Sequence, residues 1–239
     1  MPIDVIDHPD AEHPARPAAT LVLVRDGDGE VEVLMIERGA GGAFGGVWAF
    51  PGGVVEDDDV PPGTAPDPLP AARVAAVRET HEEVGLVVDT DSLVYWSHWL
   101  PPATNSLSTK RFSTWFFVAP AHDDNHHDDR ITADTDEVVT TRWLPPAVVL
   151  GMQERGEIDI VPPTYVTLTQ LARYGDVGSL LAAADPRSFA TEVVVDGDTR
   201  ICLWHGDVAY GGGDPHADGP RHRLAMDERT GWRYLNTAG

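Results

Sequence analysis

Three glutamates and a histidine fall within the stretch VRETHEEVGL, which runs from Val77 to Leu86. If this stretch is helical, Glu79, Glu82 and Glu83 are spaced i, i+3 and i+4, so their Cβ atoms lie on one face about 5–6 Å apart. Like charges in this arrangement repel one another. Two explanations fit: the face is simply solvated, or a hard divalent cation that prefers oxygen ligands gathers the carboxylates. The stretch alone does not decide between them.

The helix that carries these glutamates is expected from about Pro70 to Val84, with Gly85 in the position that ends it. Arg78 can reach Glu82 at i+4 and hold its carboxylate in one rotamer. The opposite side of the helix carries less polar residues that are expected to pack on a sheet: Val74, Val77, Thr80 and Val84. The acidic side is then turned outward or into a cleft.

Strands dominate the elements around this helix. Aliphatic runs on both sides of the turn Asp26–Gly29 predict a hairpin, and the glycine-rich segment Gly39–Gly53 is expected to be a loop around a short buried strand, VWAF. Three segments rich in valine and aromatic residues predict further strands: DSLVYWSHWLPP, RFSTWFFVAPA and EVVTTRWLPP. The pattern from Ala147 to Ala184 is helical, and a last β-like segment, TEVVVDGDTRICLWHGDVAY, precedes a tail rich in glycine, histidine and proline.

This order of elements predicts an α+β fold with a mixed sheet packed between helices, because strands and helices do not alternate as in repeated βαβ units. Residues 1–17 are polar and are expected to form a flexible arm. The main domain is expected over residues 18–185, with an acidic, proline-rich loop inserted at about 60–69. Residues 186–239 are expected to form a β-rich extension, which leaves a homodimer open.

The composition restricts the partners of the chain. Lysine and arginine number 17 against 39 aspartate and glutamate residues, and the net charge of −22 gives a surface that repels nucleic acid. A small anionic substrate therefore needs a locally cationic site, made by arginines or bound metal. The single cysteine, Cys202, excludes an internal disulfide framework, and no apolar run approaches the ~18 residues of a membrane span. A cytoplasmic protein that does not enter a membrane is expected.

A glycine turn upstream of the helix completes a known motif. The segment PGGVVEDDD carries Gly52, Gly53 and Asp59, and together with the helix it resembles the Nudix box, G-x5-E-x7-R-E-U-x-E-E-x-G-U, where U is a bulky aliphatic residue. The second half of the box is matched in order by Arg78, Glu79, Thr80, Glu82, Glu83, Gly85 and Leu86. The resemblance implies a Nudix-like α/β/α sandwich with a mixed sheet.

The chain departs from this pattern in three places. Asp59 stands where the box has its first glutamate, and Thr80 stands at a U position. Eighteen residues separate Asp59 from Arg78 where the pattern has seven, so about eleven residues are inserted. The insertion coincides with the proline-rich loop, where added length costs little entropy, so the glycine turn and the helix can still meet.

Beyond the box, the similarity extends to the Nudix branch that includes mammalian peroxisomal acyl-CoA diphosphatase. It covers roughly residues 16–185 and includes the segments Arg16–Gly27, Lys110–Phe117 and Pro162–Leu181. The resemblance implies hydrolysis of a nucleoside diphosphate linked to another group, with CoA or an acyl-CoA as the expected substrate. An ADP-ribose or NADH diphosphatase and a catalytically silent ligand sensor are the alternatives.

The resemblance also implies roles for single residues. Glu82 and Glu83 would be ligands of Mg²⁺, with Mn²⁺ as an alternative, and Glu79 would be a third ligand or the base that deprotonates water. Arg78 would orient the glutamates. Gly53 would supply backbone close to the metal. His81 occupies a variable position and is assigned no catalytic role.

Candidate substrate contacts outside the box are fewer and less specific. The cationic residues Arg38, Lys110 and Arg111 lie on segments expected to flank the cleft, where each could contact phosphate or form an ordinary ion pair. Glu137 precedes an expected strand and could be an extra ligand or only a turn residue. Pro102 follows Leu86 at a spacing associated with ADP-ribose diphosphatases, although a Pro-Pro turn explains it without any ligand and is the preferred interpretation. The cluster HDDNHHDD, at 122–129, is a further metal candidate or a solvated loop.

Overall fold

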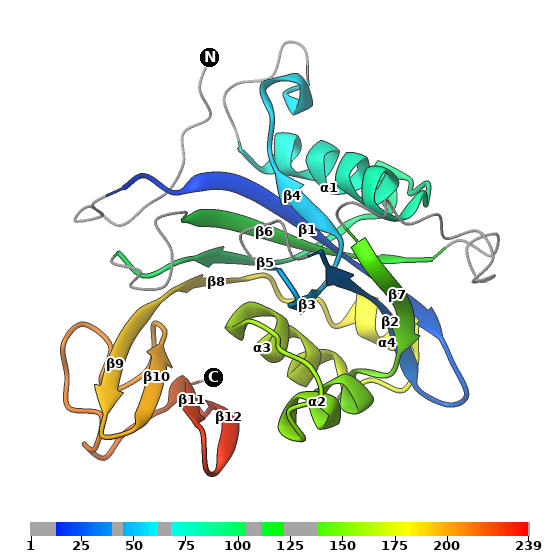
Figure 1. The fold of residues 1–239 in the computed structure, drawn as a ribbon. Helices are drawn as coiled ribbons and strands as arrows, with labels where there is room; N and C mark the ends of the chain where they lie inside the picture. The colour runs from blue at the N-terminus through cyan, green and yellow to red at the C-terminus, as the bar shows by residue number, and fades with distance from the viewer. Residues whose placement is uncertain (1–12, 40–44, 62–67, 104–110, 122–137, 239) are drawn as a thin grey trace.

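The computed structural model describes residues 13–39, 45–61, 68–103, 111–121 and 138–238 (Figure 1). Within these ranges the chain forms one 8-stranded mixed sheet, one 4-stranded sheet and four α-helices. The large sheet follows the order β3-β2-β1-β6-β5-β8, with β4 paired to β1 and β7 paired to β2. Its strands are β1 (Arg16–Asp26), β2 (Val31–Arg38), β3 (Trp48–Ala49), β4 (Gly52–Val54), β5 (Val94–Leu100), β6 (Phe112–Pro120), β7 (Val138–Leu144) and β8 (Arg187–Ala190).

Helices cover both faces of the large sheet, as Figure 1 shows. Helix α1 (Pro68–Val84) packs on one face, while α2 (Pro146–Glu154) and α3 (Pro162–Leu171) lie on the other, where the short α4 (Val177–Ala182) also contacts β1. Two hydrophobic cores result, because successive β1 residues point to opposite faces: Leu21 faces α1 and Val22 faces the other helices. The expected α+β fold with a mixed sheet between helices is confirmed.

The hairpin of β1 and β2 is confirmed, with Val24 opposite Val33. Gly29 takes a positive φ of 82° at the turn, which explains the glycine there. The strand β1 is long enough to pair with three neighbours: β2, β4 and, in parallel, β6. This central strand therefore brings the glycine turn and the aromatic strands onto one frame.

The last part of the chain forms the second sheet, in the order β12-β11-β10-β9. Its strands are β9 (Glu192–Asp196), β10 (Thr199–Leu203), β11 (His222–Asp227) and β12 (Gly231–Asn236). Trp204 follows β10 and is fully buried. Its ring packs against those of Phe189 on β8 and Trp99 on β5, and these two rings stack on each other with centroids 3.9 Å apart. The two sheets therefore share one continuous hydrophobic cluster.

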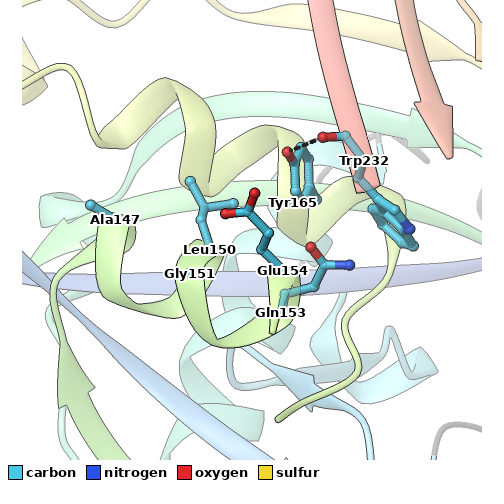
Figure 2. Close-up of a pocket in the computed structure, with 7 residues that line it drawn as sticks. All are labelled: Ala147, Leu150, Gly151, Gln153, Glu154, Tyr165 and Trp232. Atoms are coloured by element: carbon cyan, nitrogen blue, oxygen red, sulfur yellow. Dashed lines mark hydrogen bonds between the residues drawn. The ribbon is translucent and has the colours of Figure 1, made fainter. Parts of the chain in front are cut away.

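A hollow of about 280 Å³ lies where the second sheet meets the helices α2 and α3 (Figure 2). The Tyr165 hydroxyl donates a hydrogen bond of 2.8 Å to the carbonyl of Trp232, and their rings lie 5.4 Å apart. Figure 2 shows this pair at one end of the hollow, with Gln153 and Glu154 of α2 along its side. These contacts tie β12 to α3.

One local expectation is wrong, and another is correct only in part. Gly52–Val54 is a strand rather than a loop, because its backbone pairs antiparallel with Ala18–Thr20 of β1. Of the residues expected to pack on the sheet, Thr80 and Val84 are buried and Val77 packs partly buried against the core, whereas Val74 is only partly buried. The rest of the buried face of α1 consists of alanines and Glu83. Among the described residues, no helix is long and apolar enough to cross a membrane.

Candidate functional site

The site begins with the way that α1 packs on the sheet. The fully buried residues Ala71, Ala72, Ala75 and Ala76 form its contact face. Their small side chains let the helix backbone lie close to β1 and β4, and the same face continues toward the C-terminal turn. Glu83 lies on this continuation and is 1% exposed, so one carboxylate of the acidic stretch is carried into the protein. Gly85, with φ of 73°, then ends the helix.

Arg78 joins the two halves of the motif across the insertion. Its Nε and Nη2 donate to the two carboxylate oxygens of Asp59, each at 2.9 Å, and Nη2 also donates to the carbonyl of Val54 at 3.0 Å. A two-pronged contact of this kind is among the stronger charge-assisted hydrogen bonds. These contacts, with Asp59 first, raise the pKa of Arg78 beyond its usual range. Asp59, which stands at the position of the first glutamate of the motif, therefore binds the arginine of its second half.

Asp59 is itself held in place by a short turn. It ends the 3-10 helix η1 (Asp57–Asp59), and its side chain accepts a hydrogen bond of 2.8 Å from the backbone N–H of Glu56. The Glu56 side chain accepts from the Asp59 backbone in return, so the two residues form a capping box. This capping box was not predicted, because the usual sequence signal is Ser or Thr followed three positions later by Glu or Gln, and here Glu56 and Asp59 take these places.

The same guanidinium also binds two of the three glutamates. Arg78 Nη1 lies 3.0 Å from Glu79 Oε1 and 2.9 Å from Glu82 Oε2. The predicted i+4 contact between Arg78 and Glu82 is confirmed. The Glu82 side chain remains 55% exposed, whereas that of Glu79 is 15% exposed, so α1 presents one carboxylate to solvent and one at the edge of the protein.

Gly53 allows Glu79 to lie directly on the backbone of β4. A Cβ added at Gly53 would come within 2.4 Å of the Glu79 Cδ, so no larger residue fits without moving the carboxylate. Burial, opposed by Arg78, raises the pKa of Glu79. The glycine of the motif is therefore a space requirement, and the carboxylate above it is partly desolvated.

Gly52 and Arg38 hold the third glutamate. The Gly52 N–H donates to Glu83 Oε2 at 2.9 Å, and Arg38 Nη2 lies 3.0 Å from Glu83 Oε1. The same Nη2 donates to the Gly52 carbonyl. Gly52 has φ of 154°, and a Cβ there would lie 2.3 Å from the Ala19 carbonyl oxygen of β1. Gly52 is thus required by the backbone of β1, whereas Gly53 leaves space for the carboxylate of Glu79.

These contacts decide how the site could receive a metal. Among the described residues, no group of three histidine, cysteine, aspartate or glutamate side chains is already gathered to hold an ion. The three glutamates instead contact two guanidinium groups and one backbone N–H. The donor set still fits a hard divalent cation, because carboxylate oxygens on adjacent helical positions, beside a backbone that approaches them without a Cβ, match its ligand preference.

The other predicted site residues are placed less centrally. Arg111 is 3% exposed, and its guanidinium donates to the carbonyls of Pro101, Pro102 and His13. This contact set gives no support to phosphate binding by Arg111, which stays a prediction. Lys110, Glu137 and the cluster at 122–129 lie outside the described residues.

Pro102 and Cys202 bear on alternatives at the site. The Pro102 carbonyl accepts a hydrogen bond of 3.0 Å from Arg111 Nε. Pro102 therefore has a structural contact that needs no ligand. Cys202 is buried, and burial raises the pKa of its thiol to about 12. It is therefore held as the neutral thiol, away from the glutamates in sequence and on the second sheet.

Comparisons with known proteins bear on the family and the fold. The family model described as NUDIX domain matches residues 14–163, which include the glycine turn, the insertion and α1. A NUDIX hydrolase from Alicyclobacillus acidocaldarius is 24% identical, with a TM-score of 0.62 over 73% of this chain and 99% of that chain. This likeness shows the fold.

Two further solved structures are more distant. A MutT/nudix family protein from Enterococcus faecalis is 14% identical, with a TM-score of 0.43 over 98% of this chain and 58% of that chain. The NUDIX domain of Shewanella oneidensis NrtR, in complex with ADP ribose, is 17% identical with a TM-score of 0.48 over 70% of this chain and 91% of that chain. A comparison with curated proteins finds no match.

Proposed function

Because the chain belongs to the Nudix family, we propose that it is a divalent-metal-dependent hydrolase that cleaves the diphosphate of a nucleoside diphosphate linked to another group. The main support is that the guanidinium of Arg78 contacts Asp59 and two glutamates, Glu79 and Glu82. This contact joins both halves of the motif in spite of the inserted loop. A surface helix that merely carried solvated acids would need neither the buried Asp59 nor the glycine beneath Glu79.

Glu82 and Glu83 are proposed to hold Mg²⁺ or Mn²⁺, with Glu79 as a third ligand or as the base. Bound there, a divalent cation supplies charge neutralisation for the diphosphate and eases the deprotonation of water. Arg78 holds the Glu79 and Glu82 side chains in position. Glu79 suits the role of base, because partial burial raises its pKa and makes it a better proton acceptor.

The substrate is proposed to be CoA or an acyl-CoA. Support for this choice is the resemblance of the sequence to the Nudix branch of acyl-CoA diphosphatase. An ADP-ribose or NADH diphosphatase and a silent ligand sensor are the competing functions. In a chain of net charge −22, Arg38 is the proposed phosphate contact, because it lies beside Glu83 and its side chain is 26% exposed.

The test is a panel of diphosphates with Mg²⁺: CoA, acyl-CoAs, ADP-ribose, NADH and dinucleoside polyphosphates. We expect CoA or an acyl-CoA to be cleaved with the highest kcat/KM, and Glu82→Gln to lose at least about 100-fold of that value. Glu228→Gln is the matched control, since it removes the same charge from an exposed turn between β11 and β12.

Different results reject different parts of the proposal. A tenfold or greater preference for ADP-ribose over CoA would reject the substrate assignment but keep the hydrolase. No turnover of any compound, with Glu82→Gln indistinguishable from wild type, would reject the enzyme and favour a ligand sensor.

A further inference from the structure

Arg38 takes part in a closed set of contacts at the end of β2. Its Nη2 lies 3.0 Å from Glu83 Oε1 and donates to the Gly52 carbonyl, while the Gly52 N–H donates to Glu83 Oε2 at 2.9 Å. Both oxygens of Glu83 are therefore engaged, one by a cation and one by the backbone. Three elements meet in this set, because Arg38 ends β2, Gly52 begins β4 and Glu83 lies in the last turn of α1.

The burial of the two charged partners is unequal. The Glu83 side chain is 2% exposed and that of Arg38 is 26% exposed. A buried carboxylate without a counter-charge is strongly unfavourable, so Arg38 provides the positive charge that balances Glu83 in the protein alone. Glu83 is fixed by its packing on the sheet, whereas the Arg38 side chain is partly exposed. Of the two side chains, Arg38 is the one with room to move.

A metal ion on Glu83 would change this balance. Two cations on one carboxylate repel each other over a few ångströms, and this repulsion is weakly screened at a buried group. Occupation of Glu83 by Mg²⁺ therefore weakens the contact to Arg38, and the contact to Arg38 weakens the binding of Mg²⁺. By linkage, the two effects are equal in free energy.

We propose that Arg38 is a positioning residue that occupies Glu83 when no metal is bound and gives up this contact when the metal binds. The proposal rests on the proposed function, in which Glu83 is a metal ligand. Released from Glu83, the Arg38 guanidinium is available to a phosphate of the substrate, so the metal prepares the phosphate site. Metal and diphosphate then bind in order, with the metal first.

Arg78 also contacts the proposed ligands Glu79 and Glu82, but a further carboxylate holds it in place. Its two-pronged contact is to Asp59, whose side chain is 3% exposed and which is not among the proposed metal ligands. That pair keeps its charge balance whether or not a metal is present. Of the two arginines that contact the glutamates in the described part of the chain, only Arg38 is therefore proposed to exchange.

The first test measures Mn²⁺ binding by titration calorimetry, without substrate. Removal of the competing cation in Arg38→Met is expected to tighten Mn²⁺ binding at least about fivefold. Arg25→Met is the matched control, because Arg25 pairs with Glu32 at 2.7 Å on the same hairpin and its loss changes the net charge equally. Arg38→Lys, which keeps the charge, is expected to bind Mn²⁺ as the wild type does.

The second test uses methylenediphosphonate, a diphosphate analogue that resists hydrolysis. Wild type is expected to bind it at least about tenfold more tightly with saturating Mn²⁺ than without metal. Arg38→Met, with its tighter Mn²⁺ binding, is expected to lose most of that gain. Melting curves test the same exchange through stability. The Tm of Arg38→Met is expected to fall below that of wild type without metal and to be restored by Mn²⁺.

The outcomes separate the inference from the proposed function. If Arg38→Met binds Mn²⁺ no more tightly than Arg25→Met, or more weakly than wild type, the exchange is wrong while the metal site stands. If wild type itself binds no Mn²⁺, both fail together. Equal diphosphonate binding by wild type and Arg38→Met at saturating Mn²⁺ would reject the phosphate contact and the ordered binding.

Discussion

Two arginine–carboxylate groups of this protein differ in net charge. In the second sheet, Arg223 binds Asp207 with Nε and Nη2, and its Nη1 donates to the Pro215 carbonyl. Asp207 also accepts the backbone N–H groups of Ala209 and His222. One guanidinium meets one carboxylate, with side chains 7% and 0% exposed. Around α1, the single guanidinium of Arg78 meets three carboxylates, those of Asp59, Glu79 and Glu82.

The difference shows where the structure has room for another cation. The pair of Arg223 and Asp207 is balanced and fully hydrogen-bonded, so it can only stabilise the second sheet. The group around Arg78 carries more negative than positive charge and holds two of its acids at or near the surface. Charge balance, more than the number of acidic residues, distinguishes a structural ion pair from a candidate metal site.

The largest effect is expected from Asp207→Asn. The variant leaves the buried Arg223 without a counter-charge, which is expected to lower the free energy of unfolding by about 3–5 kcal/mol. Urea denaturation measures this loss. Hydrolytic activity of the folded variant should match wild type, since Asp207 contacts only residues of the second sheet and its loops. A loss below about 1 kcal/mol would show that the pair is not structural.

The same variant sharpens the comparison through its pH dependence. Burial opposes ionisation of Asp207, but hydrogen bonds from Arg223, Ala209 and His222 outweigh it and lower the pKa of this carboxyl below its ordinary value of 3.8. A lowered pKa contributes stability at higher pH that is lost as pH falls through the folded value. The gap between wild type and Asp207→Asn should therefore be constant above about pH 5 and shrink below pH 3.8. A gap that stays constant to pH 2 contradicts this assignment.

The next largest effect is expected from Gly53→Ala. Its Cβ would lie 2.4 Å from the Glu79 Cδ, so the carboxylate must move by an ångström or more. A displacement of that size is expected to lower kcat/KM by about 100-fold. Gly175→Ala is the matched control, because the nearest atom to its added Cβ is 4.0 Å away. Steady-state kinetics on the best substrate decide, and equal activity of the two variants would show that the position of Glu79 is unimportant.

Much of the fold and half of the site were predictable because they depend on local signals. The hairpin follows from aliphatic runs around a turn, and the helix follows from its capping glycine. The meeting of the glycine turn and the helix across the insertion was predicted from the motif, since a long surface loop adds little entropy cost, but the contact of Arg78 with Asp59 was not predicted.

The remaining part of the site depends on packing. The buried face of α1 was predicted correctly for Thr80 and Val84, but the alanines that form most of it were missed, and their small side chains permit a close approach to the sheet. The burial of Glu83 and its contact with Arg38 follow from that approach and from the pairing of β4 with β1. The sequence pattern does not predict the burial of Glu83 or its contact with Arg38, since 45 positions separate the two residues.

The smallest effect is expected from His81→Ala, although His81 lies between Thr80 and Glu82. This side chain is exposed and lines a shallow hollow on the outer side of α1, with Val77 and Val87, away from the buried face. We expect kcat/KM within about twofold of wild type and a change in unfolding free energy within about 0.5 kcal/mol. Since His81 shares the stretch but not the face of the glutamates, a tenfold loss of activity would mean that substrate also contacts the outer side of the helix.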